Sequence, residues 1–141
     1  MYELVYSSIA KKEISEQEIT YILNTARDFN SKNNITGCLV FHNNEFIQVL
    51  EGEKEKVKNL FENIEKDNRH YNVLLINEGE KTERLFKNWT MVYYKFDQND
   101  LDNIERKLFI ENFITFSKLA DISSDASKMF WYISKNLMRE F

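Results

Sequence analysis

Glycine and proline are scarce in this chain of 141 residues, which has three glycines and no proline. The glycines stand at positions 37, 52 and 79, so no two of them lie close enough to build the glycine-rich loop that holds a dinucleotide or a phosphate. If a nucleotide binds to this protein, other residue types must hold it.

Cysteine and histidine are also rare, with a single cysteine, Cys38, and two histidines, His42 and His70. One cysteine excludes an internal disulfide framework and any metal site built from several cysteines. Its neighbours Gly37 and Leu39 indicate a small buried hydrophobic position instead. Neither histidine has a second one nearby, so a metal site would need mostly carboxylate ligands, and we predict none.

Basic clusters and long hydrophobic runs are missing as well. The net charge is −4, and the Lys and Arg residues are interleaved with Glu, unlike a surface that follows nucleic-acid phosphates. No apolar run approaches the roughly 20 residues of a membrane span, and the start Met-Tyr-Glu-Leu lacks the basic residues of a signal peptide. We therefore expect a cytoplasmic protein that contacts neither nucleic acid nor membrane.

The composition is typical of one globular domain, with 43% hydrophobic, 30% charged and 14% aromatic residues. Apolar periodicity predicts, in order, a strand at 4–6, a helix at 16–31, strands at 35–41 and 44–52, and a helix over 57–64. Ser15 and Glu18 form the capping box expected at the start of the first helix. The asparagines at 43 and 44 suit a hairpin turn.

The next segments complete the order of elements. Residues 73–76 form a continuous apolar run, which favours a central strand buried on both faces. A polar loop over 78–84 then precedes a fifth strand at 91–94. The order βαββαβ plus a further strand predicts an α+β, ferredoxin-like fold with two helices on one face of an antiparallel sheet.

The last part of the chain has a different pattern. Apolar residues at helical spacing predict helices over 101–116 and 126–137, with a polar break at 121–124. The face of the third strand that carries Ile47 and Val49 still needs a cover. We therefore expect residues 98–141 to be a C-terminal helical extension packed on the second face of the sheet of a domain over 1–97.

Gln48 is a polar residue on an apolar face, because strand alternation places it beside Phe46 and Leu50. A buried amide without a partner costs about 1–3 kcal/mol, and Tyr6 of the neighbouring first strand can satisfy it. Asn30, at the end of the first helix, is directed at the same layer. Three polar groups around an apolar space indicate a small-molecule pocket, but they also suit a satisfied polar cluster in an ordinary core.

A second polar group, Asp67, Arg69 and His70, follows the second helix. These side chains could hold the polar or phosphorylated tail of a ligand. The alternative is a simple loop with an exposed salt bridge. Taken together, the two polar groups favour a ligand.

At these positions the sequence resembles the BLUF domains, a family of blue-light sensors that bind a flavin. The resemblance covers about residues 2–96, with spacing that needs no gaps in the first ninety residues. The matching motifs, in the family's order, are Tyr6 with Ser8, Asn30, Ile35-Thr36-Gly37, Phe46-Ile47-Gln48-Val49-Leu50-Glu51-Gly52, Asp67-Asn68-Arg69-His70 and Trp89-Thr90-Met91.

The resemblance implies that residues 1–97 are a BLUF domain that binds a flavin non-covalently between the two helices, FAD with FMN as the alternative. The implied cofactor-binding residues are Tyr6, Ser8, Arg27, Asn30, Gln48, Asp67, Arg69 and His70. The ring would face Tyr6 and Gln48, with Asn30 at its edge and His70 beside it. Arg69 would lie near the ribityl and phosphate groups.

The resemblance also implies a photochemical switch rather than an enzyme. Blue light makes the flavin a strong oxidant, Tyr6 supplies an electron and a proton, and the amide of Gln48 relays the proton and then rotates or tautomerises. The flavin absorption shifts to the red and recovers in the dark. Trp89 and Met91 would complete the switch, and the output would be binding of a downstream protein, with the C-terminal helices also available for a homo-oligomer.

Two other classes of function use the same fold. An acylphosphatase-type hydrolase needs a glycine-rich loop of backbone N–H groups, and the sequence has none between the first strand and the first helix. A ferredoxin-like small-ligand regulatory module without photochemistry would share the pocket. Such a module would purify colourless, whereas a flavin-binding protein is yellow.

Overall fold

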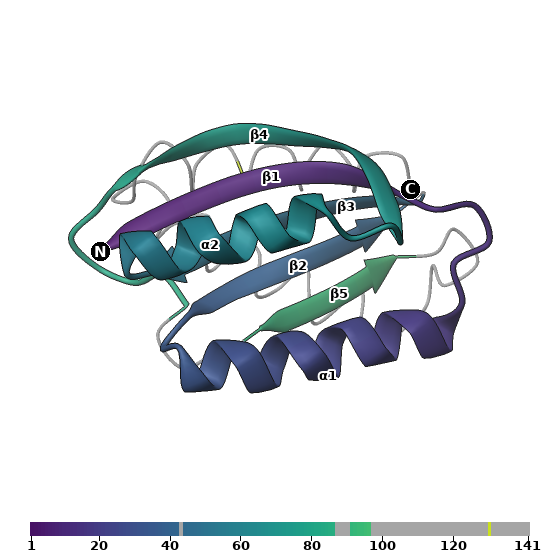
Figure 1. Ribbon diagram of the computed structural model, residues 1–141, viewed down its shortest axis with the longest axis horizontal. Helices are drawn as coiled ribbons and strands as arrows, with labels where there is room; N and C mark the ends of the chain where they lie inside the picture. Colours follow the sequence, from purple (N-terminus) through teal and green to yellow (C-terminus); the bar gives the residue numbers. More distant parts are fainter. Residues whose placement is uncertain (43, 87–90, 97–129, 131–141) are drawn as a thin grey trace.

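The computed structural model describes residues 1–42, 44–86, 91–96 and 130. Their elements, in chain order, are β1 Tyr2–Ala10, α1 Glu16–Lys32, β2 Thr36–His42, β3 Glu45–Gly52, α2 Lys54–Glu65, β4 His70–Glu80 and β5 Val92–Phe96. Both helices lie on one face of a curved sheet, with α2 across β1 and β3 and α1 along the side of β2 and β5 (Figure 1). The predicted ferredoxin-like α+β fold is confirmed.

The strands are arranged in the order β4-β1-β3-β2-β5. β1 pairs antiparallel with β3 and β4, and β2 pairs antiparallel with β3, whereas β5 runs parallel to β2. The expected contact between the first and third strands is confirmed, and their register places Tyr6 directly opposite Gln48. Side chains at these two positions therefore share the face that the helices cover.

Strand β4 does not occupy the central position predicted for residues 73–76. It lies at an edge of the sheet, where Leu74 is 62% and Leu75 41% exposed. It also continues to Glu80, so part of the loop expected over 78–84 is strand. An unbroken apolar run suits a strand buried on both faces, but among the described strands β4 pairs with β1 alone. Its register with β1 shifts twice, which changes the direction of its side chains.

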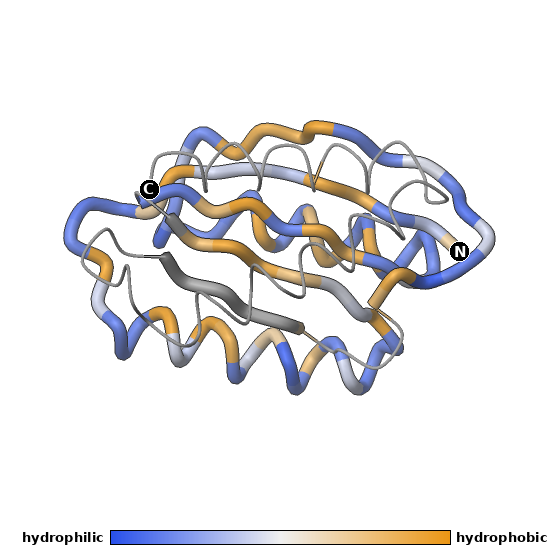
Figure 2. The backbone as a smooth tube through the Cα atoms, turned by 180° about the vertical axis from the view of Figure 1, so that it is seen from behind, coloured by the Kyte–Doolittle hydropathy of each residue, from blue (hydrophilic) through white to orange (hydrophobic). Residues whose placement is uncertain are grey.

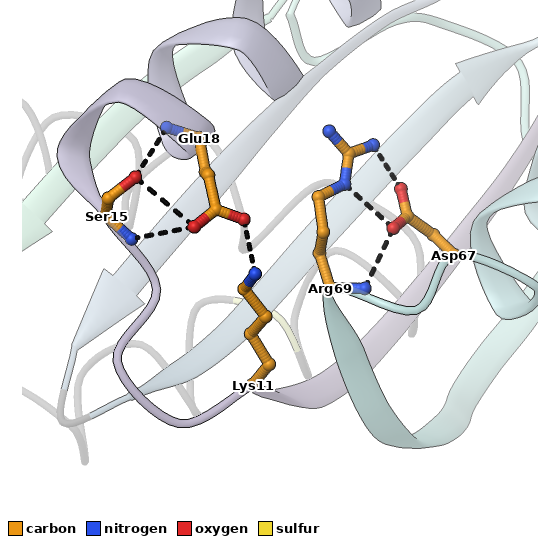
Figure 3. A network of polar contacts seen from close by, with 5 residues as sticks. All are labelled: Lys11, Ser15, Glu18, Asp67 and Arg69. Carbon is orange, nitrogen blue, oxygen red and sulfur yellow. Dashed lines mark hydrogen bonds and ion pairs between the residues drawn. The ribbon is translucent and has the colours of Figure 1, made fainter.

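Helix α1 begins at its predicted cap. The Ser15 hydroxyl accepts the N–H of Glu18 at 3.1 Å, and the Glu18 carboxylate accepts the N–H of Ser15 at 3.4 Å, so the capping box is formed (Figure 3). Lys11 adds an ion pair with Glu18 at 2.6 Å. The helix ends at Lys32, one residue later than predicted, and Asn34 adopts a positive φ of 55° before β2 begins.

The main core fills the space between the helices and the sheet. Helix α1 contributes Ile19 and Leu23, and α2 contributes Val57 and Phe61, which pack with buried sheet residues such as Leu50. These positions follow the apolar stripes of the two helices. No helix among the described residues is long and apolar enough to cross a membrane.

The opposite face of the sheet is also buried, and Figure 2 views the molecule from this side, with hydrophobic segments along the central strands. Val5 and Val49 have no exposed surface. Phe130 is helical and fully buried, and its ring meets that of Phe86 edge-on at 6.3 Å. Apart from Phe130, the helices predicted over 101–116 and 126–137, and the extension over 98–141 to which they belong, lie outside the described residues.

Candidate functional site

Gln48 has two partners, one at each end of its amide. The Tyr6 hydroxyl donates a hydrogen bond to Gln48 Oε1, and Gln48 Nε2 donates to the sulfur of Met91 at 3.2 Å. All three residues are buried, with exposed fractions of 5% or less. The sequence predicted the phenol as partner, and the structure adds the thioether.

Burial raises the pKa of Tyr6 well above its ordinary value, and the negative charge of Asp67 raises it further. The ring packs against Phe61, with centroids 5.3 Å apart. The phenol therefore keeps its proton at neutral pH, and that proton lies in the hydrogen bond to Gln48.

A cavity of about 290 Å³ opens beside this pair, between α1, α2 and the sheet. It reaches the polar residues expected at a ligand site, which are Tyr6, Asn30, Gln48, Asp67, Arg69 and His70, and it also reaches Met91. The structure therefore brings together six of the eight predicted cofactor-binding residues. Most of the remaining lining is apolar, from α1, α2 and two strands.

Asp67 and Arg69 form a tight ion pair at the mouth of the cavity (Figure 3). Asp67 Oδ1 accepts the backbone N–H of Arg69 at 3.0 Å and its Nε–H at 2.8 Å, and Oδ2 accepts a further N–H of the guanidinium. These hydrogen bonds hold the pKa of Asp67 below its ordinary value and raise the pKa of Arg69. The pair is therefore charged at neutral pH and fixes the guanidinium beside the cavity.

His70 lines the cavity and forms a second pair with Ser8 behind it. The Ile64 carbonyl accepts a hydrogen bond from His70 Nε2 at 2.5 Å, so this nitrogen carries a proton. Nδ1 lies 2.8 Å from the Ser8 hydroxyl, which donates to it in the neutral imidazole. Ser8 is thus behind His70 rather than on the cavity surface, and its part in the site is to orient the ring.

Arg27 does not line the cavity. Its Nε donates to the backbone carbonyl of Met91 at 3.2 Å, and so ties α1 to the residue that contacts Gln48. Trp89, which was predicted to take part in the switch, lies outside the described residues.

Ten of the lining residues were not among the predicted site residues, and Asn63 and Phe29 are two examples. Asn63 of α2 lines the cavity beside Leu60, and Phe29 of α1 lines it one residue before Asn30. The sequence could have indicated Asn63 as a lining residue, because it follows Leu60 by three positions and so lies on the apolar side of the helix. Phe29 belonged to the apolar stripe of the first helix, which does not distinguish a core position from a cavity wall.

The family model described as "BLUF: Sensors of blue-light using FAD" matches residues 1–92. The photoactivated adenylate cyclase subunit beta of Euglena gracilis is 31% identical over 128 residues, which is 90% of this chain but 13% of that protein. Among solved structures, BlsA in its photo-activated state has a TM-score of 0.68 at 34% identity over 92% of this chain and 90% of that chain. BlrB, a BLUF protein in its dark state, has a TM-score of 0.66 at 26% identity over 77% of this chain and 83% of that chain.

Proposed function

This chain belongs to the BLUF family of blue-light sensors that use FAD, and from that membership we propose that it is a photoreceptor whose response depends on Tyr6 and Gln48. The observation that carries the proposal is the buried chain of hydrogen bonds from the Tyr6 hydroxyl through the Gln48 amide to Met91, at the wall of a cavity.

The cavity suits a flavin in size and in chemistry. Its volume of about 290 Å³ lies just below the usual range of small-molecule pockets, about 300–1,000 Å³, which fits a flat three-ring system with its ribityl and phosphate groups at the mouth. Apolar side chains such as Ile22 and Leu60 can contact the ring faces. The amides of Asn30 and Gln48 can pair with the carbonyl and N–H groups along the ring edge.

The mouth suits the phosphate-bearing part of the cofactor. Arg69 lines the cavity, and its guanidinium still has N–H groups besides the two donated to Asp67. His70 would lie beside the ring, with Ser8 fixing its orientation. Arg27 would act on the cofactor through Met91, whose carbonyl it holds. FAD is the cofactor that the family uses, and FMN is compatible with the same site.

When bound, the flavin absorbs blue light and becomes a strong electron acceptor. Tyr6 holds the proton that must move, at a hydroxyl whose raised pKa keeps it protonated in the dark. Gln48 Oε1 is the first acceptor along the hydrogen bond, and turning or tautomerising the amide exchanges what it presents to its neighbours. Because the amide has a donor end and an acceptor end, its two arrangements differ in the hydrogen bonds available to the ring.

The output would be a change in protein binding, because the proposed roles of the site residues are flavin binding and the light-induced switch rather than catalysis. This chain covers 13% of the adenylate cyclase subunit of Euglena gracilis. We therefore do not extend the cyclase activity of that protein to this chain. We infer that residues 98–141, which follow the BLUF domain, contribute the surface for a downstream protein or for a second copy.

The test is the visible absorption spectrum of the purified protein before and after blue light, with Tyr6→Phe and Gln48→Leu measured beside it. We expect a flavin spectrum that shifts to the red and recovers in the dark, with the shift lost in both variants. Tyr71→Phe and Gln17→Leu are matched controls, because both residues are exposed and neither lines the cavity.

Two results would contradict the proposal. A protein that binds flavin but shows no light-induced shift would favour a small-ligand regulatory module without photochemistry. A shift retained in both Tyr6→Phe and Gln48→Leu would show that these residues do not carry the response.

A further inference from the structure

A carboxylate is buried on the face of the sheet opposite the cavity. Glu51 of β3 has no exposed surface and lies three residues after Gln48, so strand alternation directs the two side chains to opposite faces. Glu51 Oε1 accepts the backbone N–H of Phe86 at 2.8 Å, and Oε2 accepts that of Leu85 at 2.6 Å. Oε2 also accepts from the Lys81 ammonium. A buried charge requires such partners.

The surrounding charges compensate one another. Glu3 lies directly opposite Glu51 in the register of β1 and β3, and like charges so placed repel. The side chain of Lys81 is 7% exposed and pairs with both carboxylates, at 2.7 Å from Glu3. Arg84 donates to the Glu51 carbonyl at 3.1 Å and to the Thr36 hydroxyl at 2.8 Å, while that hydroxyl donates to Glu51 Oε1. We call Glu3, Thr36, Glu51, Lys81 and Arg84 the far-face clamp.

The far-face clamp fixes Leu85 and Phe86, in the described part of the connection between β4 and Met91. The backbone of Leu85 and Phe86 is bound to Glu51, and Met91, five residues further along, accepts the amide of Gln48. Strand β3 therefore holds this connection at two points, with Glu51 on one face and Gln48 on the other.

We propose that Glu51 is a positioning residue for the light response, acting through the connection over 81–86 to keep the sulfur of Met91 against Gln48 Nε2. This inference rests on the function proposed above. The sulfur of Met91 can bond only to the Nε2 end of the Gln48 amide, so the clamp favours return to the resting orientation. Loosening the clamp frees Met91 and prolongs the light-induced state.

Glu51→Gln is the informative substitution because it keeps the shape of the side chain and replaces one of its two acceptor oxygens with an NH₂ group. This NH₂ group faces donors. At the Oε1 position these are the Phe86 N–H and the Thr36 hydroxyl, and at the Oε2 position they are the Leu85 N–H and the Lys81 ammonium. We expect dark recovery about fivefold slower than in wild type, the factor given by weakening one ordinary hydrogen bond of the resting orientation. The NMR signal of the Met91 methyl group, assigned with Met91→Leu, should shift.

Two control variants separate this role from a loss of stability. Glu45→Gln alters an exposed glutamate on the same strand and the same face, and should leave recovery and the Met91 methyl signal unchanged. Ser15→Ala destabilises the protein at the cap of α1, far along the chain from the clamp, and should also leave both unchanged. If Glu51→Gln does not fold, Arg84→Gln weakens the same clamp from its half-buried end and should give the same changes, smaller in size.

The outcomes are distinct. Recovery at the wild-type rate with an unmoved Met91 methyl signal in Glu51→Gln, or in Arg84→Gln if the first variant is unfolded, would overturn the inference. A wild-type protein that binds flavin without responding to light would overturn the proposed function instead. In that case the methyl signal alone still decides whether Glu51 positions Met91.

Discussion

Gly37 is the position at which a single methyl group should do most harm. A Cβ added there would stand 2.0 Å from the carbonyl oxygen of Val49, whereas ordinary contact begins at 3.4 Å. It would also touch the methyl group of Met91 at 3.4 Å. Val49 cannot move away freely, because β3 is paired with β1 on one side and β2 on the other. Gly37→Ala must therefore separate β2 from β3 locally.

Overpacking a core typically costs about 1–3 kcal/mol, and a clash with fixed backbone should reach the upper end. We expect Gly37→Ala to lower the free energy of unfolding by about 3 kcal/mol, a large part of the 5–15 kcal/mol of a typical domain. With an m-value of about 1–3 kcal/mol/M, the urea midpoint should fall by about 1–3 M.

The chain supplies two matched controls for this measurement. A Cβ at Gly79 would meet nothing within 4 Å, so Gly79→Ala should change stability by less than about 0.5 kcal/mol or raise it slightly. A Cβ at Gly52 would meet Ile35 at 3.2 Å and the carbonyl oxygen of Asn34 at 3.3 Å, so Gly52→Ala should cost about 1 kcal/mol. Equal urea midpoints for the Gly37 and Gly79 variants would refute the reasoning.

Two further substitutions test the N-terminal cap of α1 and the ion pair at the mouth of the cavity. Ser15→Ala removes the hydroxyl that caps the Glu18 N–H and should cost about 1 kcal/mol in urea unfolding, whereas Ser31→Ala at the exposed far end of the helix should not destabilise. Because Arg69 holds the pKa of Asp67 below its ordinary value, this pair adds stability above pH of about 4 and loses it as the pH falls through the lowered pKa. Between pH 7 and 3, wild type should lose about 1 kcal/mol more than Asp67→Asn, and equal losses would show that the pair contributes nothing.

The pairing of Tyr6 with Gln48 could be predicted because it depends on local rules. Strand alternation decides the face of each residue, and the order of elements makes the first and third strands neighbours. The register then brings the two side chains directly opposite each other. The capping box of α1 is local in the same sense, since Ser15 and Glu18 are three residues apart.

The misplacement of β4 and the unpredicted far-face clamp depend on contacts that local patterns do not describe. The run over 73–76 is apolar throughout, which does not distinguish a central strand from an edge strand. The position of β4 in the sheet depends on how the other strands pair. Three partners of Glu51, which are Lys81, Leu85 and Phe86, lie 30 to 35 residues away, in a connection whose sequence shows only mixed charge. A signal was present, since Glu3 and Glu51 lie two residues from Val5 and Val49 and so share their buried face, where a charge needs a partner.

If the Gln48 amide turned over, so that Oε1 and Nε2 exchanged places, one of its two hydrogen bonds could form again and the other could not. The Tyr6 hydroxyl can accept as well as donate, so it suits either end of the amide. The sulfur of Met91 can accept but has no hydrogen to donate, so a reversed amide would leave Oε1 facing it without a bond. The polypeptide by itself therefore prefers one orientation, and the other can persist only while a donor inside the cavity offers Oε1 a replacement. The protein alone therefore determines the dark orientation of Gln48. The lifetime of the light-induced orientation depends on the hydrogen-bond donor of the bound ligand.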